Sequence, residues 1–273
     1  MTKLNTKPIT VWLTPSGPNP WKMLKEDQRG GFADFILVDL QVVLILEELQ
    51  VPYVIESFRF NDVKLKPYTD ICPNGRVPAI VDPNTNLTLW ESGAIIQYLE
   101  EVYDTDKKLT YESLNKRQLL NQYLHFQMSG QGPYFGQAGW FNVLHHERIP
   151  SAIERYNDQV KRFLEVLNTC LEGKAWLVGD KCTFADLSFV PWNCRLDMLL
   201  QTPPGEDPLA KYPNVQAWHH RMVDRPSWKR CMEVRDKLMD DQGLMPNGMP
   251  KGINNIQEYE AEIAREAAEK GKE

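Results

Sequence analysis

Residues 76–96 read RVPAIVDPNTNLTLWESGAII, and this stretch contains signals for two strands, a turn and a helix. Two short apolar runs, 77–81 and 87–90, flank a turn rich in Asp, Pro and Asn, which predicts a β-hairpin. The second run ends at Glu91-Ser92, where an apolar pattern of helical spacing begins and continues to about residue 103. The stretch therefore predicts two strands followed directly by a helix.

The residues upstream of this hairpin predict a small layer of strands and helices. Residues 9–14 (ITVWLT) read as a strand that ends at the cluster PSGPNP, and residues 42–49 read as a helix that is apolar on most faces. Residues 53–60 alternate as a second strand. The resulting order, βαβ and then ββα, predicts a four-stranded α/β unit.

Strand signals largely vanish beyond residue 104, so the chain divides into two predicted domains. We expect an α/β domain over residues 1–104, a polar linker over 105–111 and an all-α domain over 112–238. Residues 239–273 form a tail that is punctuated by Gly, Pro and Asn and then becomes charged. Such a tail is typical of a surface wrap that is followed by a solvated helix or a frayed end.

Composition excludes several classes of function. The 273 residues carry a formal net charge of −6 and five scattered cysteines, which gives no basis for nucleic-acid binding or for a disulfide framework. The first residues lack a signal-peptide pattern, and the most apolar stretch, 35–46, is too short to span a membrane. We therefore expect a cytoplasmic protein that partners neither nucleic acid nor membrane.

The hairpin and the helix after it carry the chemistry of a binding site. A cis Val77–Pro78 bond would turn the backbone N–H and C=O of Val77 outward, toward an extended ligand. Ser92 is a suitable N-cap, the start of its helix attracts carboxylates, and Glu91 attracts an ammonium group. An α-amino acid carries both charges. The alternative is an ordinary helix cap with a solvated Glu91.

The motifs RVPAI and WESGAI resemble the glutathione-binding half of the glutathione transferase family. The resemblance covers most of residues 9–235 through SGPNPWK, PNGRVPAI, HFQMSGQGPYFGQA, IPSAIERYNDQV and WLVGDKCTFADLSFVPWN. These motifs are similar to the fungal and bacterial branch that includes the transferase-like domain of a yeast nitrogen-regulator prion protein. The resemblance implies a thioredoxin-like amino-terminal domain, an all-α carboxyl-terminal domain and a homodimer. It also implies that Val77 and Pro78 hold the cysteinyl backbone of glutathione, and that Glu91 and Ser92 hold its γ-glutamyl end.

The resemblance places the group that activates the thiol at Asn19, in the loop after the first strand. An amide NH₂ donates a hydrogen bond to a thiolate without ionising. Ser16 is the second candidate donor, and a plain turn residue is the alternative for Asn19. The family also implies a cation for the glycyl carboxylate, for which we choose Lys64 and then Lys66, with two solvated lysines as the alternative. No cysteine lies in the loop, which disfavours mixed-disulfide chemistry through a protein thiol.

A hydrophobic electrophile needs apolar walls beside the thiolate. Residues 123–140 are aromatic and interrupted by glycines, so we expect Phe126 and Tyr134, together with Trp21, near this second site. Ordinary core packing is the alternative for these rings. The five histidines lack metal-ligand spacing, so we expect no metal.

Thr183 and Asp186 have the spacing of a capping box at the start of a buried helix. The same segment resembles the capping motif of the family, and we expect its role to be structural. Residues 23–41 depart from the family, in which PNPWK runs directly into VVLILEEL. This insert either loops out near residues 30–31 and restarts a helix near Phe32, or is a gene-model error, and it leaves Asn19 less firmly held.

Three functions are open at this point. The first is a glutathione transferase of the detoxification type, which conjugates or exchanges the glutathione thiol with hydrophobic electrophiles. The second is a glutathione-dependent peroxidase or thiol-disulfide oxidoreductase. The third is a non-enzymatic regulatory binding protein on the same fold.

Overall fold

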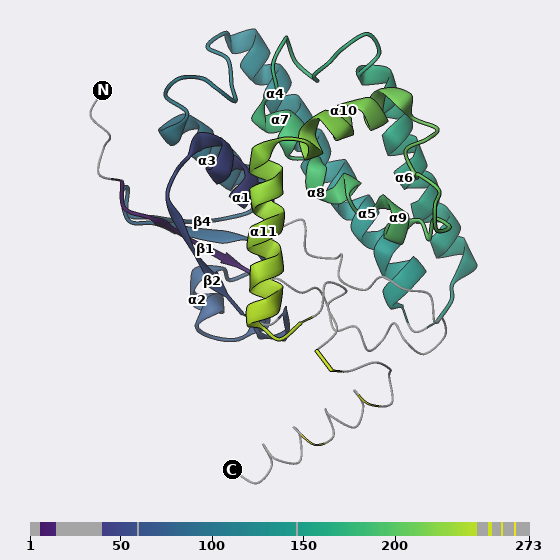
Figure 1. Cartoon of the computed structure of the whole chain (residues 1–273), viewed down its shortest axis with the longest axis horizontal. Coiled ribbons are helices and arrows are strands. Elements are labelled where there is room, and N and C mark those ends of the chain that lie inside the picture. The colour runs from purple at the N-terminus through teal and green to yellow at the C-terminus, as the bar shows by residue number, and fades with distance from the viewer. Residues whose placement is uncertain are drawn as a thin grey trace.

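The strands of the amino-terminal part form one mixed sheet (Figure 1). The computed structural model describes residues 6–14, 40–58, 60–145, 147–244, 251–252, 258 and 265. The strand order is β2-β1-β3-β4, in which β1 and β2 are parallel and the other two pairs are antiparallel. The strands are β1 (Ile9–Leu13), β2 (Tyr53–Ser57), β3 (Ala79–Asp82) and β4 (Leu87–Trp90). The predicted four-stranded α/β unit is confirmed.

The pairing of β1 with its neighbours determines which side chains enter the core. Val11 lies opposite Ile55 of β2 and opposite Ile80 of β3. Ile9, Val11 and Leu13 are at most 1% exposed, whereas the residues between them are half-buried. Side chains of a strand alternate between its two faces, so this period of two directs one apolar face of β1 to the core.

Helix α1 (Leu40–Leu49) is buried on nearly all sides, because four helices pack against it. These helices are α3 (Ser92–Tyr103), α7 (Phe184–Leu187), α8 (Val190–Asn193) and α11 (Pro226–Asp241). Gln50, with a φ of +55°, follows its last residue. The helix starts two residues before the predicted range 42–49, so Leu40 and Gln41 of the predicted insert form its first turn. The rest of the insert, residues 23–39, lies outside the described residues.

The hairpin of β3 and β4 is fixed to α3 (Ser92–Tyr103), the helix that follows it as predicted. Asp82, at the end of β3, is buried and accepts hydrogen bonds at 2.5 Å from the hydroxyls of Tyr98 and Tyr103, and one at 2.8 Å from the N–H of Asn84. Burial raises the pKa of the Asp82 carboxyl, but these hydrogen bonds outweigh it and lower that pKa below its ordinary value.

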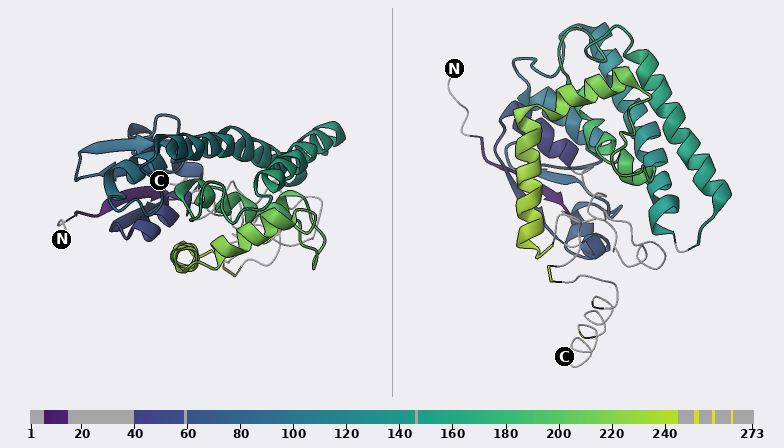
Figure 2. Two further views of the ribbon diagram at one scale, coloured as in Figure 1. Left: turned by 90° about the horizontal axis from the view of Figure 1, so that it is seen from above. Right: turned by 45° about the vertical axis from the view of Figure 1, so that its right-hand side comes forward.

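The described chain beyond residue 104 is helical, as predicted, and lies beside the sheet (Figures 1 and 2). A π-helical turn, η4 (Gln127–Gln131), joins α4 (Leu114–Phe126) to α5 (Gly132–Gly139), and a second π-helical turn, η5 (Trp140–Leu144), continues from the end of α5. A 3₁₀ turn, η3 (Phe60–Lys64), and the short α2 (Tyr68–Ile71) lie between β2 and β3. The helical part consists of α4 (Leu114–Phe126), η4 (Gln127–Gln131), α5 (Gly132–Gly139), η5 (Trp140–Leu144), α6 (Pro150–Cys170), α7 (Phe184–Leu187), α8 (Val190–Asn193), α9 (Leu196–Leu199), α10 (Pro213–Val223) and α11 (Pro226–Asp241).

The predicted capping box at the start of α7 is confirmed. Thr183 donates to Asp186 Oδ2 twice, from its hydroxyl at 2.8 Å and from its N–H at 2.9 Å. The other oxygen of this fully buried carboxylate accepts the N–H of Leu177 and the indole N–H of Trp218, both at 2.9 Å. Asp186 thus satisfies donors from three separate segments, which is a structural role.

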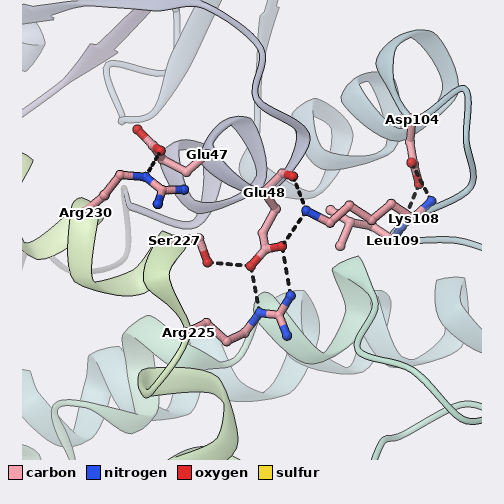
Figure 3. Close-up of polar contacts among 8 residues, drawn as sticks. All are labelled: Glu47, Glu48, Asp104, Lys108, Leu109, Arg225, Ser227 and Arg230. Atoms are coloured by element: carbon pink, nitrogen blue, oxygen red, sulfur yellow. Dashed lines mark hydrogen bonds and ion pairs between the residues drawn. The ribbon is translucent and has the colours of Figure 1, made fainter.

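A buried carboxylate ties the two parts of the molecule together (Figure 3). Glu48 of α1 is 4% exposed and accepts two hydrogen bonds from the Arg225 guanidinium, at 2.7 and 2.9 Å, and one from the Ser227 hydroxyl. The Lys108 ammonium lies 3.1 Å from the same carboxylate. Burial raises the pKa of Glu48, but its hydrogen bonds with Arg225 and Ser227 outweigh burial and lower this pKa to about 2.

Candidate functional site

The Val77–Pro78 peptide bond is cis, as the resemblance implies. It comes directly before β3, whose strand pairing begins with Ala79 opposite Trp12 and Trp90. Val77 is half-buried and Pro78 is buried. The bend therefore lies just outside the paired part of the sheet, at the place where the sequence predicts an extended ligand.

A small aromatic cluster supports this bend, and sequence reasoning missed it. Tyr68 is 2% exposed, and its hydroxyl donates to the backbone carbonyl oxygen of Arg76 at 2.5 Å. The rings of Phe58 and Trp12 lie 4.7 and 6.0 Å from the Tyr68 ring, and Val77 packs against the same cluster. No periodic pattern marks Tyr68, because its partner lies in a loop.

Glu91 has an unusual backbone conformation at the start of α3. It occupies the N-cap with φ +73° and ψ +115°, a region that residues with a side chain rarely adopt, and its side chain is exposed. Such a conformation costs about 1–3 kcal/mol and is typical of functional sites. The expectation that Ser92 is the N-cap is wrong, because the chain turns sharply at Glu91 and helical geometry begins one residue later.

The first backbone N–H groups of α3 take no part in the hydrogen bonds of the helix. The first N–H bonded within the helix is that of Ile95, which donates to the Glu91 carbonyl at 3.0 Å. The N–H groups of residues 92–94 therefore have no partner inside the helix, and they form its positive end. Ser92 is 7% exposed, and its hydroxyl donates to the sulfur of Met128 at 3.5 Å.

The two candidate lysines have different surroundings. The Lys64 ammonium donates to the carbonyl oxygen of Asn74 at 2.8 Å, in the turn that leads to the cis bond. The Lys66 ammonium instead forms an exposed ion pair with Asp70 at 2.8 Å. Lys64 is thus fixed on the loop next to Val77, whereas the charge of Lys66 is paired within its own segment.

The predicted electrophile residues are described only in part. The Phe126 ring stacks on Phe163 of α6, with ring centres 4.3 Å apart and an angle of 15° between the planes, so it also has the packing role offered as the alternative. Tyr134 is half-buried on α5. Asn19 and Trp21, like the second candidate donor Ser16, lie outside the described residues.

A hollow outlined by described residues lies away from this bend. It has a volume of about 440 Å³ and lies between the end of α1, the start of β2 and α11. The Glu47 carboxylate in its wall accepts a hydrogen bond from the Tyr53 hydroxyl at 2.7 Å and from Arg230 at 2.5 Å. The charged groups of this hollow are therefore already paired with one another.

Within the described part of the chain, no group of three or more His, Cys, Asp or Glu side chains is arranged to hold a metal ion. Over the same residues, no helix combines the length and apolarity needed to cross a bilayer. Burial raises the pKa of the Cys182 and Cys231 thiols, which lie in the core and not at the bend.

Comparison with known proteins identifies the family. The glutathione S-transferase N-terminal domain model matches residues 40–102, and the C-terminal domain model matches residues 133–226. The glutathione S-transferase-like protein tpcF of Aspergillus fumigatus is 41% identical over 235 residues, which cover 83% of this chain and 95% of that protein. The chain belongs to the glutathione S-transferase family. The N-terminal family model includes Lys64, Val77, Pro78, Glu91 and Ser92.

Two further relatives confirm the predicted branch of the glutathione S-transferase family. The crystal structure of the glutathione transferase URE2P8 from Phanerochaete chrysosporium, with oxidized glutathione, matches with a TM-score of 0.73 and 34% identity, covering 88% of this chain and 99% of that chain. Protein URE2 of Meyerozyma guilliermondii is 33% identical over 230 residues, which cover 70% of this chain and 75% of that protein. The thioredoxin-like domain followed by an all-α domain is likewise confirmed.

Proposed function

We propose that this protein is a glutathione transferase that conjugates or exchanges the glutathione thiol with hydrophobic electrophiles. The observation that carries the proposal is the exposed Glu91 carboxylate beside the first N–H groups of α3, which have no hydrogen-bond partner inside the helix. An anion next to the positive end of a helix complements the ammonium and the carboxylate of the γ-glutamyl group. The strained backbone of Glu91 supports a binding role for this corner.

Each part of glutathione then has a partner in this chain. Glu91 holds the ammonium group, while Ser92 and the first N–H groups of α3 hold the adjoining carboxylate. The backbone of Val77, before Pro78, pairs with the cysteinyl residue. Lys64 holds the glycyl carboxylate at the other end.

The chemical step is a nucleophilic substitution or addition by the thiolate. With an aryl halide, the S–H proton leaves to solvent, the sulfur forms a bond to the ring carbon and the halide departs. Asn19 donates its amide N–H to the sulfur and so favours the thiolate, because a hydrogen bond to a charged form stabilises that form. We assign Phe126 and Tyr134 of the helical part, together with Trp21, to the electrophile site.

Isothermal titration calorimetry with reduced glutathione tests the binding step. We expect association at sub-millimolar to millimolar concentration, and Glu91→Gln is expected to weaken it about tenfold, the effect of losing one charge-assisted contact. Glu112→Gln is the matched control, since Glu112 is also exposed and lies in the loop before α4. No association at millimolar glutathione, or equal affinity of Glu91→Gln and wild type, would refute the proposal.

A second candidate is a glutathione-dependent peroxidase or thiol-disulfide exchange enzyme. The support for it is that the Phanerochaete chrysosporium relative was crystallised with oxidized glutathione, the product of such a reaction. Turnover of 1-chloro-2,4-dinitrobenzene and of cumene hydroperoxide, measured side by side, separates the two activities. Glutathione binding without either turnover would instead assign the protein a regulatory binding role.

We also propose that the protein is a cytoplasmic homodimer with a role in detoxification. Large apolar side chains are exposed on the edge strand β4 and on α3 and α4, and an edge strand is a natural place for a second chain to pair. These side chains are Leu87, Trp90, Val102, Leu114 and Leu119. Light scattering is expected to give twice the chain mass, and Leu119→Glu is expected to lower it.

A further inference from the structure

The π-helical turn η4 brings Met128 against the start of α3. The Ser92 hydroxyl donates to the Met128 sulfur at 3.5 Å. A Cβ atom placed on Gly93 would lie 3.1 Å from Met128 Cγ and 3.4 Å from the sulfur. The thioether therefore occupies the space that a side chain at position 93 would need. It lies directly beside Ser92, which we propose to bind glutathione.

Buried amides hold this turn in place. Gln127 donates to Gln131 Oε1 at 3.1 Å, and Gln131 donates to Asn193 Oδ1 of α8 at 2.9 Å. All three side chains are at most 4% exposed. Because buried hydrogen-bonded amides are costly to rearrange, the backbone of η4 holds the Met128 side chain next to Ser92.

Ser92 has one hydroxyl hydrogen and two possible acceptors. A thioether is a weak acceptor, so the carboxylate of an arriving ligand takes this hydrogen from Met128 without difficulty. An oxygen on the sulfur would compete with the carboxylate for this hydrogen, because a sulfoxide is polar whereas a thioether is apolar. The added oxygen would also crowd the close contact between Met128 and Gly93.

We propose that Met128 is an oxidation site through which hydroperoxides lower the affinity of this protein for glutathione. The proposal rests on the glutathione site proposed above. A hydroperoxide transfers one oxygen atom to the sulfur: the S–O bond forms, the O–O bond breaks and an alcohol or water leaves. The sulfur is oxidised and the hydroperoxide is reduced. The sulfoxide oxygen then competes with the ligand carboxylate for the Ser92 hydroxyl hydrogen, and the ligand must displace this contact to bind.

The other described methionines offer matched comparisons. Met128 and Met232 are half-buried, whereas Met198, Met222 and Met239 are at most 9% exposed. Met232 lies on α11, on an element that contributes nothing to the proposed glutathione site. We therefore expect peroxide to oxidise both half-buried methionines, but only the oxidation of Met128 to change glutathione binding.

The experiment uses the full chain, treated with hydrogen peroxide and then desalted. Mass spectrometry of peptides measures oxidation at each methionine, and calorimetry measures the glutathione dissociation constant before and after treatment. The dissociation constant of each variant after treatment is divided by that of the same variant before treatment, so differences in starting affinity between variants do not affect the comparison. We expect wild type and Met232→Leu to lose at least fivefold in affinity, Met128→Leu to lose less than twofold, and methionine sulfoxide reductase to restore wild type.

Three results would overturn the proposal. The first is a Met128 that stays reduced while Met232 is oxidised, and the second is an oxidised Met128 with unchanged glutathione affinity. The third is an equal loss in Met128→Leu and wild type, which would assign the effect to another residue such as a cysteine. Untreated wild type in the same assay tests the proposed glutathione site itself. If untreated wild type does not bind glutathione, the proposed function fails, and this result is distinct from the three above.

Discussion

Replacement of Glu48 by Gln removes the charge at the centre of the cluster in Figure 3 and keeps the size of the side chain. The Arg225 guanidinium and the Lys108 ammonium would then face a neutral amide in a site that is 4% exposed at Glu48. Removal of one partner of a buried ion pair is destabilising, because the remaining charge loses its compensation. Here that charge is mainly the Arg225 guanidinium, whose side chain is 27% exposed, whereas the Lys108 side chain is 51% exposed and reaches solvent. We therefore expect Glu48→Gln to lower the free energy of unfolding.

The size of this loss follows from the pKa of Glu48. A pKa lowered from an ordinary 4.5 to about 2 means that the folded state favours the charged carboxylate by about 3 kcal/mol. Because the folded pKa is lowered, this stabilisation is complete above pH 4.5 and is lost as the pH falls toward 2. Glu48→Gln is thus expected to cost about 3 kcal/mol at pH 7, and roughly half of that at pH 3.

Urea unfolding followed by tryptophan fluorescence, at pH 7 and at pH 3, measures both quantities. The control is Glu47→Gln, one residue earlier on α1, whose ion pair with Arg230 is more exposed and is expected to contribute about 1 kcal/mol or less. Equal destabilisation by the two variants would refute the reasoning. A difference in unfolding free energy between Glu48→Gln and wild type that is the same at both pH values would refute it as well.

Further predictions concern the capping box and the proposed site. Asp186→Ala is expected to cost at least about 3 kcal/mol, because it leaves several buried donors without an acceptor; an unfolding free energy within 1 kcal/mol of wild type would contradict this. Asn19→Ala is expected to lower kcat for 1-chloro-2,4-dinitrobenzene on the order of 100-fold, and full turnover would remove its catalytic assignment. Lys64→Gln is expected to weaken glutathione binding about fivefold in calorimetry, whereas Lys66→Gln, which loses only its exposed pair with Asp70, is expected to leave it unchanged; equal effects would contradict the choice of Lys64.

Local patterns in the sequence predicted most of the fold. The hairpin, the helix after Glu91 and the capping box at Thr183 are each specified by residues within a few positions of one another, and all three are present. The cis bond before Pro78 was expected only through the family resemblance of its motif, because spacing alone does not predict a cis bond. Turn residues and period are local signals, which explains why these elements were predictable.

Features that depend on distant partners were not predictable in the same way. Glu48 acquires its role from Lys108, 60 residues on, and from Arg225, 177 residues on. A methionine on a helix normally indicates core packing, so nothing local marked Met128 as a partner of Ser92. Serine favours the N-cap position, so propensity indicates Ser92, whereas the positive φ of Glu91 cannot be derived from propensity.

Helix α1 precedes the predicted linker in sequence but is enclosed by both halves in space, where one apolar core continues from Ile9 to Cys231. Its two ends are anchored on the helical side, Gln41 to the Ser188 carbonyl and Glu48 to Arg225. Cutting the chain at the linker would therefore expose the apolar surface of α1 in the amino-terminal fragment. It would also expose the apolar side chains that pack against α1 in the carboxyl-terminal fragment. Neither fragment is expected to be an autonomous module for recombination, although the two expressed together should reassemble.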